Sequence, residues 1–185
     1  MRDVLFIQGA GEGTHANWDI HLVESLRRQL GPSYSVRYPE MPDEANPTVA
    51  AWRPVIEREL AALRPGSVVI GHSVGGTVLI HVLAEVAPAS VLGAIVSIAA
   101  PFIGEGGWTS EELAPRTDLA ERLPDVPIFL YHGVDDAEVP VSHLDRYAAA
   151  LPSAHVRRLA GRDHQLNNDL SEVARDLRAL AELER

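Results

Sequence analysis

The sequence predicts one α/β domain, spanning residues 1–185, built on a mainly parallel β-sheet. Short runs rich in β-branched residues alternate with longer segments of helical apolar periodicity, which is typical of strand–helix–strand units. The chain has 185 residues, of which 46% are hydrophobic, enough for one buried core. Residues 65–84 and 86–104 contain no Asp, Glu, Lys or Arg, and their glycines and prolines favour buried strands and a buried helix over a membrane span.

The expected strands are the β-branched runs bounded by turn residues. They lie at 3–8, 34–38, 67–71, 91–99, 126–132 and 154–159. After the first of them, apolar residues recur at helical spacing until Gly31-Pro32 ends the pattern. These apolar residues are Trp18, Leu22, Leu26 and Leu30.

A second helix is expected to begin with Asn46 as its N-cap and Pro47 in its first turn. Its apolar stripe comprises Val49, Trp52, Ile56, Leu60 and Leu63. Pro54 lies within the stripe and is expected to kink the helix or restart it, because proline lacks an amide proton and crowds the preceding turn. Further helices are expected at 74–85, 142–151 and 166–184.

The connection 101–125 is long and rich in proline and glycine. Long connections in compact domains are usually functional, and those that follow strand carboxyl ends flank the ligand site of open α/β sheets. Phe102, Trp108 and Leu113 are therefore candidates for lining an acyl pocket, the alternative being that they only cover the core.

Composition excludes several chemistries. The chain has no cysteine and no lysine, since all 16 basic residues are arginine. Thiol nucleophiles, disulfides, Schiff bases and a phosphate-binding Walker lysine are thus excluded, and a covalent mechanism must use a hydroxyl or a carboxylate. The net charge of −10 and the scattered arginines disfavour nucleic acid as a partner. His15 and His21 have no zinc-site spacing, so no metal is expected.

The segment 67–77 carries the main functional signal. A β-branched run leads into Gly71-x-Ser73-x-Gly75, and a segment compatible with a helix follows directly. This pattern is typical of a nucleophile elbow, a turn so tight that the serine hydroxyl stands clear of the backbone. Glycines on both sides of Ser73 fit the close approach of strand and helix, where a Cβ would clash. A coincidental tight turn is the alternative.

A serine nucleophile needs a base to remove its proton and an acid to orient that base. Downstream, a strand at 126–132 ends in a turn that contains Asp135 and Asp136, and the last strand is followed by a loop that contains His164. The chain order Ser, Asp, His is the order expected when the nucleophile lies on a strand-to-helix elbow.

With these three segments the sequence resembles the α/β-hydrolase family. Residues 71–76 match the family's elbow, 132–140 match its H-G-x-x-D-x-x-V-P segment, and Asp163-His164 lie in its histidine loop. The resemblance covers essentially the whole chain. By size the chain is similar to the small, lid-poor serine hydrolases of the YdeN-like and retinoblastoma-binding-protein-9-like group. It implies a minimal α/β-hydrolase fold: a doubly wound, six-stranded sheet of order 2-1-3-4-5-6 with helices on both faces.

The resemblance also implies roles for individual residues. Ser73 matches the nucleophile, His164 the general base and Asp136 the acid, with Asp135 as the alternative acid because neighbouring side chains diverge. Asp163 is expected to be exposed to solvent.

Two other histidines lie close to these motifs. His72 adjoins the serine and is expected to be structural, because adjacent side chains on a turn point apart. His132 ends a strand and is expected to hydrogen-bond the acid loop.

The donors of an oxyanion hole are expected to be backbone amides. One is the N–H of Val74, directly after the nucleophile, and the other is the N–H of Ala10 in the glycine-rich loop after the first strand. Gln8 stands where a histidine is common in the family, so the orientation of this loop is open. A phosphate-binding turn is the alternative, but the loop lacks the G-x-G-x-x-G spacing.

The expected function is hydrolysis of small carboxylic esters through an acyl-enzyme on Ser73, without a cofactor or a metal. The alternatives are a thioesterase or amidase that uses the same triad, or a non-catalytic module that binds a ligand or a protein. The expected partner is a small ester, not nucleic acid or a membrane, and the oligomeric state, monomer or dimer, is open. The N-terminal apolar run ends at Gln8, too early for a secretory signal, so a cytoplasmic location is expected.

Overall fold

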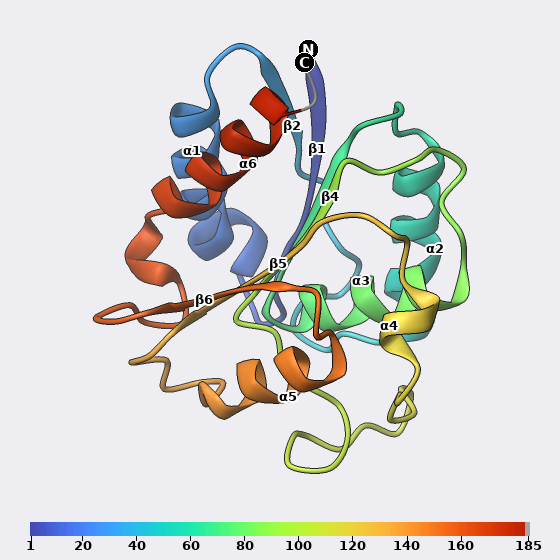
Figure 1. Cartoon of the computed structure of the whole chain (residues 1–185). Coiled ribbons are helices and arrows are strands. Elements are labelled where there is room, and N and C mark those ends of the chain that lie inside the picture. Colours follow the sequence, from blue (N-terminus) through green and yellow to red (C-terminus); the bar gives the residue numbers. More distant parts are fainter. Residues whose placement is uncertain (184–185) are drawn as a thin grey trace.

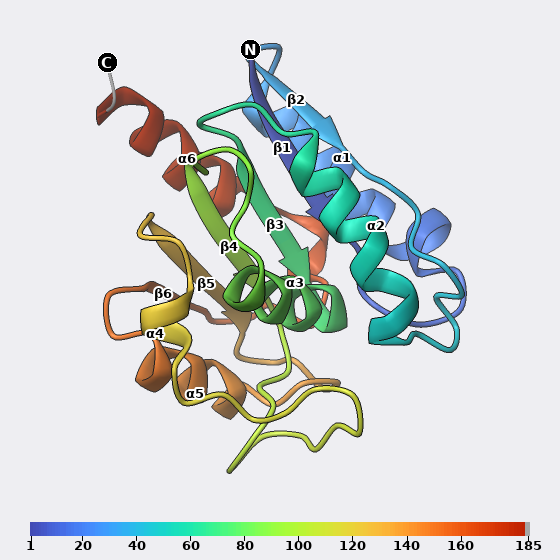
Figure 2. The same cartoon turned by 90° about the vertical axis from the view of Figure 1, so that its right-hand side faces the viewer.

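A computed structural model describes residues 1–183. Its centre, shown in Figure 1, is a six-stranded parallel sheet with the order β2-β1-β3-β4-β5-β6, which the strand labels of Figure 2 follow. The strands are β1 (Arg2–Ile7), β2 (Tyr34–Arg37), β3 (Val68–His72), β4 (Ala94–Ile98), β5 (Ile128–Gly133) and β6 (His155–Leu159). The predicted fold class and strand order are confirmed.

Helices cover both faces of the sheet. They are α1 (Asp19–Leu30), α2 (Val49–Ala61), α3 (Ser73–Glu85), α4 (Leu119–Arg122), α5 (Ser142–Ala150) and α6 (Ser171–Leu183), with a π-helical turn at Thr14–Trp18 and a 3₁₀ turn at Leu166–Asn168. One face carries α1 and α6, which pack against each other, and α2 and α3 lie on the opposite face, the one toward the viewer in Figure 2. No helix within residues 1–183 has both the length and the apolar character to cross a membrane.

The sheet is buried on both faces, because successive side chains of a strand point to opposite sides. In β1, Val4 and Phe6 join the core beneath α1 and α6, whereas Leu5 and Ile7 join the core beneath α2 and α3. All four side chains are fully buried. This two-sided burial explains why the central strands read as continuous apolar runs rather than as alternating patterns.

The predicted start of α2 was wrong. The helix begins at Val49 rather than at Pro47, and Thr48 is its N-cap, with a side-chain oxygen 3.2 Å from the Ala51 nitrogen. The carboxylate of Glu112 also accepts the Val49 N–H, at 2.8 Å. These two acceptors satisfy amides that have no partner within the helix, and they fix its first turn.

Pro54 does not restart α2, which is helical from Val49 to Ala61. Proline removes one hydrogen bond inside a helix. Trp52 and Ile56, one on each side of Pro54, are fully buried against the sheet. This packing holds the helix across the missing hydrogen bond.

The predicted helix at 166–184 is also shorter than expected, and position 184 lies outside the described residues. Leu166, Asn167 and Asn168 have φ values of 49°, 55° and 56°, which form a left-handed turn before α6 starts at Ser171. Asp163 and Asn167 stabilise this turn by exchanging side-chain-to-backbone hydrogen bonds of 2.7 and 3.0 Å. Side-chain bonds of this kind compete with helix formation.

Thr48→Ala is expected to lower the free energy of unfolding by about 1 kcal/mol, because the Ala51 amide loses its cap. Urea denaturation of the variant beside wild type measures the change. Thr48→Ser, which keeps the hydroxyl, should retain most of the stability. Thr117→Ala, at an exposed position, is the control, and an equal loss in both alanine variants would contradict the assigned cap.

Candidate active site

Ser73 lies where β3 ends and α3 begins, with a φ of 50°. A left-handed conformation is strained for a serine and occurs mainly where the surroundings enforce it. A Cβ on Gly71 would lie 2.5 Å from the Gly76 Cα, and one on Gly75 would overlap the carbonyl oxygen of Gln8. The three glycines therefore allow β3, α3 and the loop after β1, the predicted oxyanion loop (residues 8–13), to meet closely around the serine.

Ser73 and His164 line the same cavity of about 520 Å³, here called the main cavity. Val74, Ala10, Trp108 and Gln165 also contribute to its wall. The segments involved follow the carboxyl ends of β1, β3, β4, β5 and β6, which meet at one edge of a parallel sheet. The fold thus brings residues from distant parts of the chain to one opening.

Asp136 holds one side of the His164 ring. The Nδ1 of His164 lies 2.7 Å from a carboxylate oxygen of Asp136, which is buried. The other oxygen accepts the backbone N–H groups of Glu138 and Val139, at 2.9 and 2.8 Å. Burial alone would raise the pKa of Asp136, but hydrogen bonds from His132, His164 and Val139 outweigh it and hold this pKa well below its ordinary value.

The neighbouring acids lie elsewhere. Asp135 and Asp163 are both exposed, and Asp163 bonds the backbone of Asn167. His132, fully buried, lies 2.8 Å from the Val139 carbonyl oxygen and 3.1 Å from Asp136 through its Nε2, so it bonds the acid loop. Of the candidate acids, Asp136 is the one that the structure places against His164.

The hydroxyl of Ser73 and the ring of His164, both within the described residues, are not joined by a hydrogen bond. The Nε2 of His164 likewise has no partner in this part of the chain. Hydrogen bonds of catalytic groups are often long without substrate and shorten only in the reacting complex. The Nε2 of His164 is therefore available for a hydrogen bond to a group bound in the main cavity.

The backbone amides of the two predicted oxyanion-hole residues, Ala10 and Val74, have no hydrogen-bond acceptor within residues 1–183. Val74 is the second residue of α3, so its N–H has no acceptor within the helix, and the Ala10 N–H has none among residues 1–183. Both residues line the main cavity. Gln8, fully buried, fixes this loop by donating to Glu44 at 2.5 Å and accepting the Met41 N–H at 3.0 Å.

Sequence reasoning missed Asp19. Its side chain is fully buried beneath the main cavity and lies 2.9 Å from Nδ1 of His72, whose Nε2 lies 3.1 Å from the backbone oxygen of His164. His72 is predicted to be structural. Each of its two ring nitrogens lies within hydrogen-bond distance of a protein atom, and neither is left free for a ligand in the cavity. No local pattern distinguishes Asp19, because an aspartate in the first turn of a helix is common.

The three residues of the 101–125 connection that were predicted to line an acyl pocket lie at different places in the structure. Trp108 is 41% exposed and lines both the main cavity and a smaller cavity of about 170 Å³, here called the side cavity. Leu113 is buried in the wall of the side cavity. Phe102 lies elsewhere, with its ring edge-on to Tyr147 at 5.1 Å, so it is not brought to Ser73.

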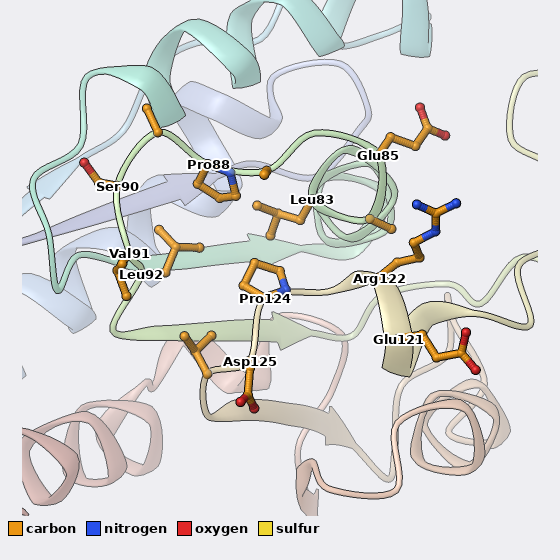
Figure 3. A pocket seen from close by; sticks show the side chains of 14 residues that line it. Leu83, Glu85, Pro88, Ser90, Val91, Leu92, Glu121, Arg122, Pro124 and Asp125 are labelled. Carbon is orange, nitrogen blue, oxygen red and sulfur yellow. The ribbon is translucent and has the colours of Figure 1, made fainter.

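Another cavity, of about 550 Å³, lies far from Ser73 and is drawn in Figure 3. The end of α3 and the segments that precede β4 and β5 form its wall, so it opens at the amino ends of the strands. Pro88, Val91 and Pro124 line it together with charged residues, but it contains no serine–histidine pair. Within residues 1–183 no group of three or more His, Asp or Glu side chains could hold a metal ion.

Residues 4–169 match the family model described as serine hydrolase. The chain belongs to the serine hydrolase family. No curated protein sequence matches it. The fold is similar to that of the ydeN gene product from B. subtilis, with a TM-score of 0.79, 17% identity, and coverage of 98% of this chain and 100% of the other.

Two further solved structures share the fold of this serine hydrolase. The esterase domain of a Rhodothermus marinus protein has a TM-score of 0.73, 21% identity, and coverage of 97% of this chain and 86% of the other. A lid-less a/b serine hydrolase from Xanthomonas campestris has a TM-score of 0.64, 15% identity, and coverage of 97% and 80%. At these identities the likeness shows the α/β-hydrolase fold.

In the Asp136→Asn variant, the free energy of unfolding is expected to fall less steeply with decreasing pH than in wild type. A carboxylate whose folded-state pKa lies below its ordinary 3.8 adds stability above that pH, and this stability is lost as the pH falls through the folded-state pKa. Urea denaturation across the acidic range should therefore show a shallower decline for the variant. Asp135→Asn, at the exposed neighbour, is the control and should keep the wild-type slope; identical slopes for all three proteins would contradict the assignment.

Proposed function

We propose that this serine hydrolase cleaves small carboxylic esters through an acyl-enzyme on Ser73. The observation that carries the proposal is the shared cavity: the strained serine lines it together with a histidine whose Nδ1 is held by the buried Asp136. A serine hydroxyl becomes a nucleophile when such an oriented base removes its proton.

The reaction follows from this arrangement. The Ser73 oxygen attacks the ester carbonyl while Nε2 of His164 takes the hydroxyl proton, and Asp136 stabilises the resulting imidazolium. The Ala10 and Val74 amides donate to the oxyanion of the tetrahedral intermediate. His164 then protonates the leaving alcohol, which leaves the serine acylated. Water, activated by His164 in the same way, releases the acid and restores Ser73.

The size and lining of the side cavity favour a substrate with a small acyl group. It adjoins Val74, the residue after the nucleophile, and its wall is largely apolar, including Trp52, Val78, Ile103 and Leu113. Its volume is about 170 Å³. An apolar cavity of roughly 150 Å³ holds a molecule the size of benzene. Acyl groups up to about that size fit within this space.

The charge of the main cavity favours an ester substrate whose alcohol portion is neutral or cationic. Its wall carries four carboxylates, from Glu12, Asp135, Glu138 and Asp163, and no arginine of residues 1–183 lines it. A cavity lined by one sign of charge repels ligands of the same sign. Esters with a neutral alcohol are therefore the substrates to try first, and the likeness to an esterase domain supports esters over amides.

Wild-type protein is expected to react rapidly with a fluorophosphonate probe, because the probe is attacked by an activated serine. Ser73→Ala should abolish the labelling, and in-gel fluorescence with intact-protein mass spectrometry measures it. Ser97→Ala, at a buried serine of β4 outside the cavity, is the control and should still be labelled. A folded wild-type protein that is not labelled would overturn the hydrolase proposal and favour a non-catalytic binding module.

Leu113→Ala is expected to shift the acyl preference toward longer chains, because it enlarges the side cavity. A graded series of p-nitrophenyl esters, assayed as kcat/KM, measures the shift; one methylene in an apolar pocket changes it by roughly tenfold or more. Leu123→Ala, also buried but away from both cavities, should lose stability and keep the wild-type preference. An unchanged preference in Leu113→Ala would place the acyl group elsewhere.

A further inference from the structure

One buried carboxylate connects three of the loops that form the site. Asp19, at the start of α1 and 0% exposed, accepts the backbone N–H of Gly9 at 2.7 Å, next to the proposed oxyanion donor Ala10. It lies 2.9 Å from Nδ1 of His72, the residue before the nucleophile. It also accepts the side-chain amide of Gln165, the residue after the proposed base, at 3.1 Å.

The hydrogen bonds of His72 define its charge. Nε2 lies 3.1 Å from the backbone oxygen of His164, which can only accept, so Nε2 carries a proton. Nδ1 faces the carboxyl group of Asp19, whose oxygens also accept from Gly9 and Gln165. The ionised carboxylate can only accept, so opposite it Nδ1 carries a proton as well. Both ring nitrogens then donate, and the ring is an imidazolium.

The surroundings agree with this charge state. Burial alone would lower the pKa of His72, but the facing carboxylate of Asp19 raises it above its ordinary value, with a smaller contribution from Asp136. The pKa of Asp19 is lowered in turn, because His72, Gly9 and Gln165 together outweigh its burial. The ring of His164, with its centre 4.9 Å away, is a further titratable group beside His72.

We propose that Asp19 and His72 form a permanent buried ion pair that positions the reacting groups of the hydrolase. The inference rests on the proposed function. Neither side chain reaches substrate, since they are 0% and 1% exposed, so both are positioning residues. The hydrogen bonds of the pair hold the oxyanion loop, the nucleophile elbow and the backbone of His164 in fixed positions relative to one another.

A positioning role predicts a particular kinetic change. Displacement of a reacting group by about 1 Å costs on the order of a hundredfold in rate. Weakening the pair should therefore lower kcat and the rate of fluorophosphonate labelling by about tenfold to a hundredfold. KM should change by no more than about twofold, because the cavity walls that contact substrate remain intact.

Three variants test this. Asp19→Asn removes the charge but keeps the shape, His72→Asn keeps a donor near Nδ1, and His72→Gln keeps one near Nε2. Each should lower kcat, and the double variant Asp19→Asn/His72→Gln should be little worse than the worse single variant, because the two residues act as one unit. Folded single variants with wild-type kcat would overturn the proposal.

Asp176→Asn is the matched control. Asp176 is another largely buried carboxylate, which bonds the Tyr131 hydroxyl at 2.7 Å and Nε of Arg157 at 2.9 Å, on the α6 face of the sheet. Its loss should lower stability without changing kcat. If Asp176→Asn lowered kcat as much as Asp19→Asn, the effect would follow from lost stability and the positioning role would be overturned.

A second measurement does not depend on activity. In wild-type protein labelled with ¹⁵N-histidine, NMR should show both ring nitrogens of His72 protonated at neutral pH, with the signals assigned by their absence in His72→Gln. An unprotonated Nδ1 would instead mean a neutral pair and would overturn the ion pair, even in a protein that labels normally. Failure of wild-type labelling with both nitrogens protonated would overturn the hydrolase proposal and leave the ion pair standing.

Discussion

The strained backbone of Ser73 is the constraint on which the rest of the site depends. A left-handed serine costs about 1–3 kcal/mol, so the surrounding structure must enforce it. Here β3 lies between β1 and β4, all five of its residues are buried, and α3 is buried along most of its length. Displacing the serine would require strand and helix to separate, and the apolar surface between them opposes that separation far more strongly than the strain favours it. The proposed nucleophile is thus held between two buried elements, β3 and α3.

Local patterns explain why much of this site could be predicted from sequence. The elbow, the acid loop and the histidine loop each follow a strand whose β-branched run is legible in the sequence, and a parallel sheet brings such ends together. Asp19 could not be predicted, because its partners Gly9, His72 and Gln165 lie 10, 53 and 146 positions away along the chain. The wrong start of α2 has a similar origin, since the carboxylate of Glu112, which accepts the Val49 N–H, lies 63 positions away. Long-range side-chain contacts leave no periodic trace in a single sequence.

The connection 101–125 shows how an irregular segment can still give a defined substrate site. Its first residues are fixed to the domain: the Pro101 oxygen accepts the hydroxyls of Thr77 and Tyr147, at 2.6 and 3.1 Å, and the Phe102 N–H donates to His143 at 2.9 Å. Glu112 anchors its middle to α2. Between these anchors Trp108 stays partly exposed, at the boundary of the main and side cavities. In the proposed function, substrate selection depends on this segment, which is anchored at intervals rather than formed by regular secondary structure.

The site contains two aspartate–histidine pairs with similar geometry and opposite uses. In both, Nδ1 of the ring faces a buried carboxylate, at 2.7 Å for His164 and 2.9 Å for His72. The difference lies at Nε2, which is free in the cavity on His164 but bonded to a backbone oxygen on His72. A ring with a free Nε2 can gain and lose a proton in each cycle, whereas a ring with both nitrogens engaged must break a buried hydrogen bond to do so, at a cost of about 1–3 kcal/mol. In the proposed mechanism, the partner of Nε2, rather than the carboxylate, therefore decides which histidine transfers protons and which one holds the loops in place.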